Sequence, residues 1–228
     1  DFIQTINEQI DVVSGVLNKW LFDAKHEKAA TTLIDNSLRV LLLEDFSLQK
    51  LAKDNRLDEM EFYLPLEELQ IDNLKQILFK HLPKEWQVVR NAVETLDFKQ
   101  VEGYLKGFID LIFEHQDKYY LADYKSNTLN DYDQESLLKT MADSHYYLQY
   151  LLYSVALHRY LQKRIAQYSW DTHFGGAYYL FIRGMNPEEK SVKIGGGGYN
   201  MVSSGVFFHK PDRELIEAID GLFVKAIL

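Results

Sequence analysis

Two aspartates and a lysine near the middle of the chain have the residue types that metal-dependent phosphate chemistry needs. Asp110 and Asp123 lie thirteen residues apart, and Lys125 follows Asp123 by two. Carboxylate oxygens suit the hard cations Mg²⁺, Mn²⁺ and Ca²⁺. A cation held in this way can polarise a phosphoryl oxygen and lower the pKa of a bound water. A nearby lysine can offset charge that develops on the phosphate. The three residues therefore indicate phosphodiester hydrolysis, provided that the fold brings them together.

A β-hairpin would do so. The segments Tyr104–His115 and Lys118–Ser126 are both rich in strand-forming residues. Gln116 and Asp117 stand between them as a two-residue turn, although Asn-Gly or Asp-Gly would favour such a turn more strongly. The sequence therefore predicts two antiparallel strands in which His115 pairs with Lys118.

This register decides where the charged side chains lie. Asp110 faces Asp123, with Cβ atoms about 5 Å apart, and Lys125 shares their side of the sheet. Two facing carboxylates repel one another in a bare hairpin, and a divalent cation between them would remove that repulsion. An exposed hairpin with solvated charges is the alternative interpretation.

Longer segments of the chain resemble a known family. They occur in the same order as in that family and cover nearly the whole sequence, so the resemblance is much more specific than the short Asp-x-Lys pattern alone. The chain resembles the nuclease domains of the RecB type, found in bacterial RecBCD (exonuclease V) helicase–nucleases and belonging to the PD-(D/E)XK superfamily. The matching segments are Met60–Pro65, Gly107–Phe113, Tyr119–Asn127, Leu148–Tyr153, Ala156–Leu161 and Phe174–Gly184.

The resemblance implies a fold and a set of site residues. The fold is α/β and restriction-endonuclease-like, with a central mixed sheet flanked by helices and an N-terminal helical part. Asp110 and Asp123 become metal ligands, the backbone carbonyl of Tyr124 becomes a further ligand, and Lys125 becomes the catalytic lysine. Mg²⁺ is the implied cofactor, and Mn²⁺ or Ca²⁺ can replace it in binding.

Three further residues are carried over from the family. Glu61 matches a strand carboxylate that precedes the hairpin in related nucleases. Gln149 and Tyr153 match a Gln-x-x-x-Tyr motif and are implied to contact the DNA strand near the metal. Four residues apart, they share one face of a helix.

The resemblance also implies an assembly. The chain would hydrolyse DNA as the Mg²⁺-dependent nuclease domain of a RecBCD-type helicase–nuclease, in double-strand break repair and recombination in the cytoplasm. A helicase would deliver single-stranded DNA, and RecC-like and RecD-like subunits would be partners. An inactive nuclease-fold module that docks or guides the strand is the alternative. Inactive relatives lose the two acids and the lysine, all of which are kept here.

One part of the family pattern is missing. The family carries a Gly-x-x-x-His segment just upstream whose histidine binds metal, and this sequence begins at Asp1, after that point. No Walker-type phosphate loop of a helicase motor is present. We therefore expect an excised domain with weakened activity, and expect a version extended upstream to bind Mn²⁺ more tightly.

Composition sets broad limits on the function. The chain has 228 residues, 46% of them apolar, and no cysteine, which excludes disulfides and zinc–thiolate sites and suits a reducing compartment. The net charge of −9 gives no basic footprint for DNA. Residues 1–70 hold 14 acidic and 7 basic residues, so most of the excess negative charge lies outside the hairpin. We expect weak DNA binding by charge alone, and a helical part at 1–56 before a nuclease core at 57–228.

The remaining elements follow from hydrophobic periodicity and breaker residues. A run of glycines at 195–198 predicts a flexible loop. The predicted helices cover 4–20, about 28–46, 72–82 with Asp72 as its cap, 134–165 with a bend near Asp143, and 212–226 with Asp212 as its cap. The predicted strands outside the hairpin cover 58–66, 175–183 and 205–209. On the first of these, Met60, Phe62 and Leu64 are expected on one side and Glu61 and Tyr63 on the other.

Overall fold

The chain folds as an α/β protein in two compact units, described here from a computed structural model. The structure describes residues 6–43, 45–97, 101–189, 192–193 and 201–223. The first unit consists of Asp1–Arg56, Tyr124–Gln134 and Tyr179–Phe207, and the second of Leu57–Asp123, Glu135–Tyr178 and Phe208–Leu228. The proposed division into 1–56 and 57–228 stays a prediction.

A five-stranded sheet organises the protein, in the order β1-β2-β3-β4-β7. β2 and β3 are antiparallel. The amide of Ile182, just after β4, donates to the carbonyl of Lys125 at the end of β3 at 3.0 Å. The last residues of β3 and β4 therefore adjoin, so these strands run parallel and the sheet is mixed. The strands are β1 (Arg56–Leu69), β2 (Val101–His115), β3 (Lys118–Lys125), β4 (Phe174–Phe181) and β7 (Val206–His209).

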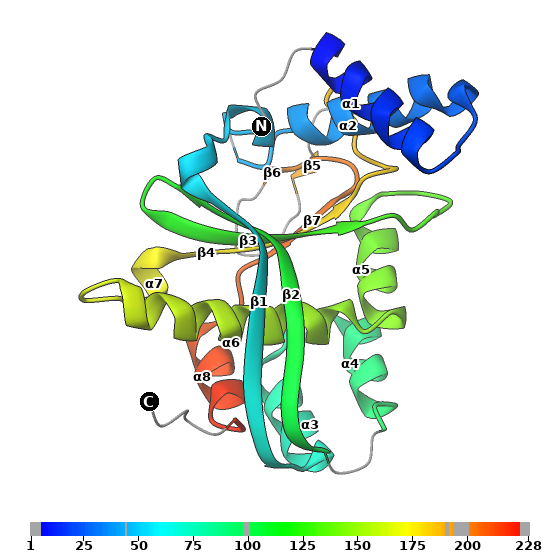
Figure 1. The fold of residues 1–228 in the computed structure, drawn as a ribbon. Coiled ribbons are helices and arrows are strands. Elements are labelled where there is room, and N and C mark those ends of the chain that lie inside the picture. The colour runs from blue at the N-terminus through cyan, green and yellow to red at the C-terminus, as the bar shows by residue number, and fades with distance from the viewer. Residues whose placement is uncertain (1–5, 44, 98–100, 190–191, 194–200, 224–228) are drawn as a thin grey trace. The chain divides into compact units, whose positions relative to one another are not determined.

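Helices cover the sheet in the second unit. Figure 1 shows α6 crossing β1 and β2. The rings of Phe62 on β1 and Tyr153 on α6 meet edge to face, with their centroids 5.5 Å apart. α8 packs on both α6 and α3, and α3 packs on α4. These helices are α3 (Ile71–His81), α4 (Gln87–Glu94), α5 (Gln134–Asp143), α6 (Tyr146–Arg164), α7 (Trp170–His173) and α8 (Arg213–Asp220).

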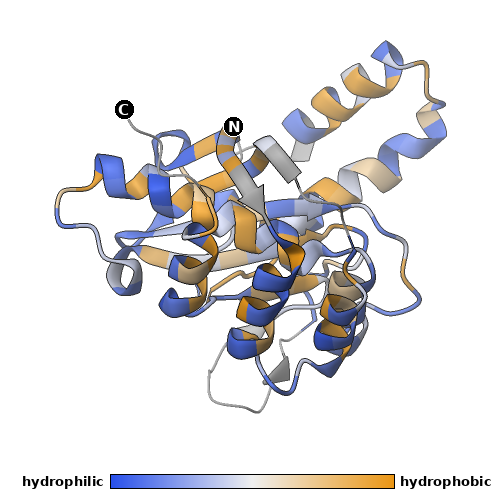
Figure 2. Cartoon of the chain, turned by 90° about the horizontal axis from the view of Figure 1, so that it is seen from below, coloured by the Kyte–Doolittle hydropathy of each residue, from blue (hydrophilic) through white to orange (hydrophobic). Residues whose placement is uncertain are grey.

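The first unit contains a helical hairpin in which α1 packs on α2. Figure 2 shows hydrophobic and hydrophilic residues interspersed along the helices of the chain. In α1, Val13 is buried, whereas Val12 and Val16 are 51% and 50% exposed. Its elements are α1 (Ile6–Lys19), η1 (Ala24–His26), α2 (Glu27–Arg39), η2 (Leu48–Lys50), η3 (Lys53–Asn55), β5 (Val192–Lys193) and β6 (Met201–Val202). None of the helices in the described part of the chain is long and apolar enough to cross a membrane.

The hairpin has the predicted register. His115 pairs with Lys118, and the ladder continues to the pair of Leu111 and Ala122. Gln116 and Asp117 both have positive φ, at 53° and 60°, which is the backbone of a type I′ turn and matches the twist of the strands. The Asp117 amide also donates to Glu114 Oε1 at 2.8 Å, so the weak turn residues gain a local hydrogen bond.

Two other predictions are confirmed. Met60, Phe62 and Leu64 are buried on β1 while Tyr63 between them is exposed. The long helix predicted at 134–165 breaks between α5 and α6, where His145 adopts a left-handed conformation with φ of 53°. The strand alternation and the bend near Asp143 were therefore both readable from the sequence.

Several predicted boundaries were wrong. The second helix ends at Arg39 because Val40 turns extended, with ψ of 134°, and begins a segment whose burial alternates. Asp72 is not a cap, since α3 begins at Ile71. β1 continues through Pro65 to Leu69, which is possible because it is an edge strand. α4 was missed.

At the C-terminal end, Asp212 occupies the N-cap position of α8, as predicted, but its side chain makes no capping hydrogen bond. The helix ends at Asp220 rather than near 226. The predicted loop at 195–198 lies outside the described residues.

Candidate active site

The two hairpin aspartates lie where β2 and β3 face each other. The observed pairs end at Leu111 and Ala122, and Asp110 and Asp123 are the next residues along β2 and β3. Asp123 is only 4% exposed, and Asp110 is half-buried. Burial disfavours a charged carboxylate, so two acids placed this close form a site where bound positive charge is strongly favourable.

Tyr124 and Lys125 complete β3. Tyr124 follows Asp123 directly, and Lys125 stands two residues beyond Asp123. The Lys125 Nζ lies 4.9 Å from the centre of the Tyr179 ring. That contact lies within cation–π range and restrains the lysine side chain at the end of the strand.

Gln149 and Tyr153 are paired on α6. Gln149 Nε2 donates to the Tyr153 hydroxyl at 2.7 Å. Burial, together with the charges of Asp123 and Asp110, raises the pKa of Tyr153 to about 12. The charges of both carboxylates thus act on this hydroxyl, and the predicted role of Gln149 and Tyr153 at the site stays a prediction.

Phe62 and Gly107 support Tyr153 from beneath, and the sequence analysis did not single them out for this. A Cβ placed on Gly107 would lie 2.5 Å from Cζ of Phe62, and the Phe62 ring contacts Tyr153. The glycine thus leaves the space in which Phe62 can sit under Tyr153. A glycine within a predicted strand was the available signal, since it often marks a close approach.

Residues 23–220 match the family described as the PD-(D/E)XK nuclease superfamily. The chain belongs to this superfamily. Its β2–β3 hairpin carries the family's acid–acid–lysine pattern, with Asp110 on one strand and Asp123 and Lys125 on the other.

Curated relatives of this superfamily member are named RecBCD enzyme subunit RecB. The chain is 40% identical to that of Haemophilus influenzae over 91% of its own length and 15% of the relative's. It is 36% identical to that of Escherichia coli over 97% of its length and 19% of the relative's. It is 30% identical to that of Mycolicibacterium smegmatis over 79% of its length and 18% of the relative's. The chain therefore spans less than a fifth of each of these proteins.

The donor atoms fit a hard divalent cation, as in other PD-(D/E)XK nucleases. Two carboxylates and a main-chain carbonyl are oxygen donors of the kind that Mg²⁺ and Ca²⁺ prefer. Among the residues that the structure describes, no group of three histidine, cysteine, aspartate or glutamate side chains could hold a metal. The site thus offers two acidic side chains, which suits Mg²⁺ because it usually keeps several waters.

Glu61 is not grouped with Asp110 and Asp123 as a third potential metal-binding side chain. It forms an ion pair with Lys106 on β2, and the hydrogen bond from Lys106 lowers the pKa of its carboxyl group. In this arrangement Glu61 serves to position Lys106. Its predicted role as a further site carboxylate stays a prediction.

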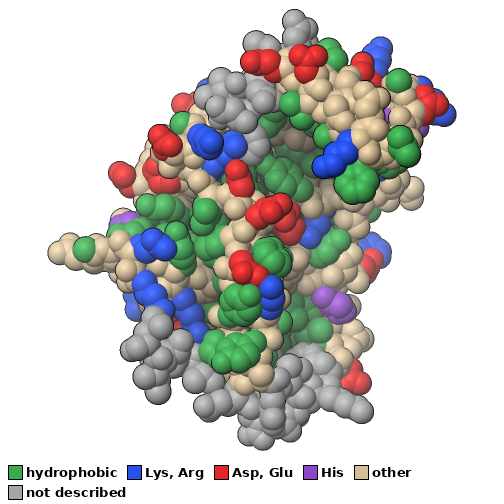
Figure 3. All heavy atoms as spheres, in the orientation of Figure 1, with side chains coloured by type: hydrophobic (Ala, Val, Ile, Leu, Met, Phe, Trp, Pro, Cys, Tyr) green, Lys and Arg blue, Asp and Glu red, His purple; other side chains and the backbone are tan. Residues whose placement is uncertain are grey.

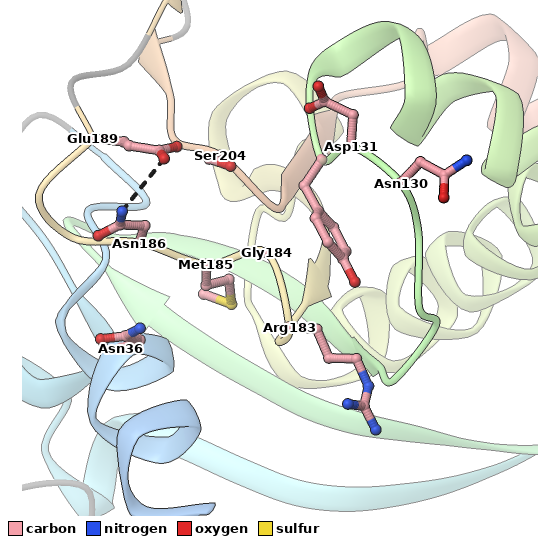
Figure 4. A pocket seen from close by; sticks show the side chains of 10 residues that line it. Asn36, Asn130, Asp131, Arg183, Gly184, Met185, Asn186, Glu189 and Ser204 are labelled. Atoms are coloured by element: carbon pink, nitrogen blue, oxygen red, sulfur yellow. Dashed lines mark hydrogen bonds between the residues drawn. The ribbon is translucent and has the colours of Figure 1, made fainter. Parts of the chain in front are cut away.

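A separate polar pocket of about 490 Å³ lies in the first unit. Figure 4 shows Asn186 hydrogen-bonded to Glu189 at its edge. Arg183 there donates from Nε to the Ser126 carbonyl at 2.9 Å. No predicted site residue lines this pocket. Its lining is Asn36, Asn130, Asp131, Tyr132, Arg183, Gly184, Met185, Asn186, Glu189 and Ser204.

Proposed function

We propose that the chain is the nuclease module of a RecBCD-type helicase–nuclease and that it hydrolyses phosphodiester bonds of DNA with Mg²⁺. The observation that carries this proposal is the register of β2 and β3, which pairs Leu111 with Ala122 and so brings Asp110 and Asp123 to the next positions of the two strands. Lys125 follows on β3. Asp123 is buried and Asp110 half-buried, and a divalent cation held by both carboxylates would be favoured by their like charge. Membership of the PD-(D/E)XK nuclease superfamily supports the same chemistry.

Each residue has a role that follows from its chemistry. Asp110, Asp123 and the Tyr124 carbonyl hold the cation. When bound, the cation supplies Lewis-acid polarisation of the phosphate and an acidified water. Lys125 orients the attacking water and offsets negative charge on the phosphate oxygens.

The helix pair acts on the substrate as hydrogen-bonding groups. Because its pKa is raised to about 12, the Tyr153 hydroxyl stays protonated at neutral pH. It can therefore donate a hydrogen bond to a phosphate oxygen but cannot act as a general base. Gln149 fixes the direction of that hydroxyl through their hydrogen bond, so the pair would position the DNA strand beside the aspartates.

The parent assembly would supply what this chain lacks. The relatives are subunits of the RecBCD enzyme, and the chain spans less than a fifth of each. We place the helicase motors in the rest of such a polypeptide and RecC-like and RecD-like subunits beside it, acting in double-strand break repair and recombination in the cytoplasm. Strand delivery by a motor would make capture by charge unnecessary, in keeping with the net charge of −9.

A cleavage assay on end-labelled single-stranded DNA tests the proposal. Asp123→Ala and Lys125→Ala should each lower the rate in Mg²⁺ by about a hundredfold or more, while circular dichroism stays unchanged. Asp143→Ala is the matched control, because that exposed aspartate pairs with Lys139 on its own helix, and it should keep full activity. Full activity in Asp123→Ala would refute the assignment.

A further inference from the structure

One face of β1 and β2 exposes large aromatic side chains in a row. Tyr104 is 75% exposed, Phe108 49% and Tyr63 53%, and the Lys106 side chain lies among them at 50%. We call these four residues the aromatic stripe. Figure 3 shows hydrophobic and charged side chains gathered over the β1–β2 ribbon on this face. All four belong to the second unit.

The stripe is internally organised. Lys106 Nζ lies 5.4 Å from the centre of the Tyr63 ring and 5.2 Å from that of Phe108, so one cation contacts both rings. Glu61 pairs with the same lysine. These contacts hold the rings and the ammonium group in fixed relative positions, with about half or more of each side chain left to solvent, which differs from a random scatter of exposed apolar residues.

The stripe continues into the candidate active site. Every second residue from Tyr104 to Asp110 on β2 points to the same face. These residues are Tyr104, Lys106, Phe108 and Asp110. Successive side chains on that face are about 7 Å apart. An extended strand of nucleic acid laid along β2 could therefore stack one base after another on the rings and bring its backbone to Asp110.

We propose that the aromatic stripe is a binding track for an unpaired DNA strand that leads to Asp110. The proposal rests on the proposed nuclease function and names the form in which the substrate reaches the site. Every base has a π face, so stacking on Tyr104, Phe108 and Tyr63 accepts any sequence. Lys106 lies within reach of the phosphates between stacked bases.

Charge on this face argues for stacking as the main source of binding. Glu61 offsets part of the positive charge of Lys106, so few counterions are released when a strand binds, and the affinity should fall only gently with salt. Glu61→Gln should leave Lys106 uncompensated. We expect this variant to bind single-stranded DNA more tightly and with a steeper salt dependence.

Photo-crosslinking locates the strand without relying on cleavage. An oligonucleotide containing 5-iodouracil is irradiated with the full chain of 228 residues in Ca²⁺, and the crosslinked peptides are mapped by mass spectrometry. We expect crosslinks at Tyr104 or Phe108. The same experiment on Asp123→Ala should give the same crosslinks, because that substitution leaves the stripe intact.

Kinetics provide the second measurement. Tyr104→Ala and Phe108→Ala should each raise KM for single-stranded DNA about tenfold, the size expected for loss of one stacked base, with kcat unchanged. Tyr104→Phe keeps the ring and should restore KM. Trp20→Ala is the control, since Trp20 is a similarly exposed aromatic residue at 66% that lies outside β1 and β2, and its KM should stay at the wild-type value.

The outcomes separate this inference from the proposed function. Crosslinks elsewhere, with unchanged KM in the stripe variants, would overturn the track even if Asp123→Ala abolishes cleavage. Crosslinks at the stripe in a chain that cleaves nothing would support the track and reject the nuclease. If the stripe variants instead weaken binding to a protein partner and leave DNA crosslinking intact, the face is a protein interface and the track is wrong.

Discussion

The two faces of β2 carry different kinds of side chain over the same stretch of strand. On one face, Ile109 and Leu111 are buried and Gly107 lies under the Phe62 ring. The other face carries the β2 residues of the aromatic stripe and then Asp110. Because neighbouring residues in a strand point to opposite faces, one strand can hold the core together on one side and carry the proposed substrate-binding residues on the other. Substitutions at adjacent positions should therefore affect different measurements.

Asp110→Asn should give the largest effect, and on activity alone. The amide keeps the shape of the side chain but loses a charged ligand, whose loss we put at several kcal/mol of stabilisation, or about a thousandfold in rate. Thermal stability should stay or rise, because the repulsion between facing carboxylates is removed. Cleavage of single-stranded DNA and a melting curve check this. A variant that unfolds would break the distinction between the faces.

Ile109→Ala, one residue away, should reverse the pattern. Ile109 is fully buried, and loss of its side chain should cost about 2–5 kcal/mol of unfolding free energy. Cleavage per folded molecule, measured well below the melting temperature, should be unchanged. Urea denaturation gives the first quantity and active-site-normalised rates the second. Equal loss of rate and stability would show that the two faces are not independent.

Gly107→Ala should show a smaller loss of stability that spreads to the site. The added Cβ would meet the Phe62 ring at 2.5 Å, and overpacking of this kind costs about 1–3 kcal/mol. Displacement of Phe62 should also disturb Tyr153 and slow cleavage. Gly15→Ala is the matched control, since it meets nothing within 4 Å in α1 and should stabilise the protein by about 0.5–1 kcal/mol. A neutral Gly107→Ala would mean that Phe62 moves freely.

Tyr153→Phe should give the smallest effect. The Tyr153 ring contacts Phe62, while the charges of Asp123 and Asp110 act on its hydroxyl. Loss of the hydroxyl should slow cleavage by about two- to tenfold, the value of one hydrogen bond, without changing the pH–rate profile between pH 6 and pH 10. The neutral tyrosine is favoured in the fold, so its contribution to stability is lost only as pH rises above 10 toward its raised pKa of about 12. A profile whose alkaline limb disappears in Tyr153→Phe would instead make this residue a titrating group.

The sequence predicted most of the architecture near the hairpin, because local rules decide it there. The register of His115 and Lys118 follows from turn length, and the sidedness of Met60 and Phe62 follows from alternation. The spacing of Gln149 and Tyr153 was sufficient to predict their shared helix face, and the structure adds the hydrogen bond between them.

What local rules could not supply are contacts between distant segments. The ion pair of Glu61 with Lys106 joins β1 to β2, and the ring contact of Phe62 with Tyr153 joins β1 to α6. Neither is encoded in the spacing of nearby residues. α4 was missed although Val89 and Val93, both buried, show helical spacing, because the segment is short and follows a proline.

The tight turn at Gln116 and Asp117 makes the length of the hairpin tip as important as the residues at its base. Inserting a single amino acid there shifts the pairing by one position and turns every side chain of one strand to the opposite face. Asp123 would then no longer share a face with Asp110, some five residues below the tip on β2. Exposed loop tips usually accept insertions freely. In a scan of insertions along this gene, the hairpin tip should therefore be as intolerant as a catalytic position, although it carries none of the proposed site residues.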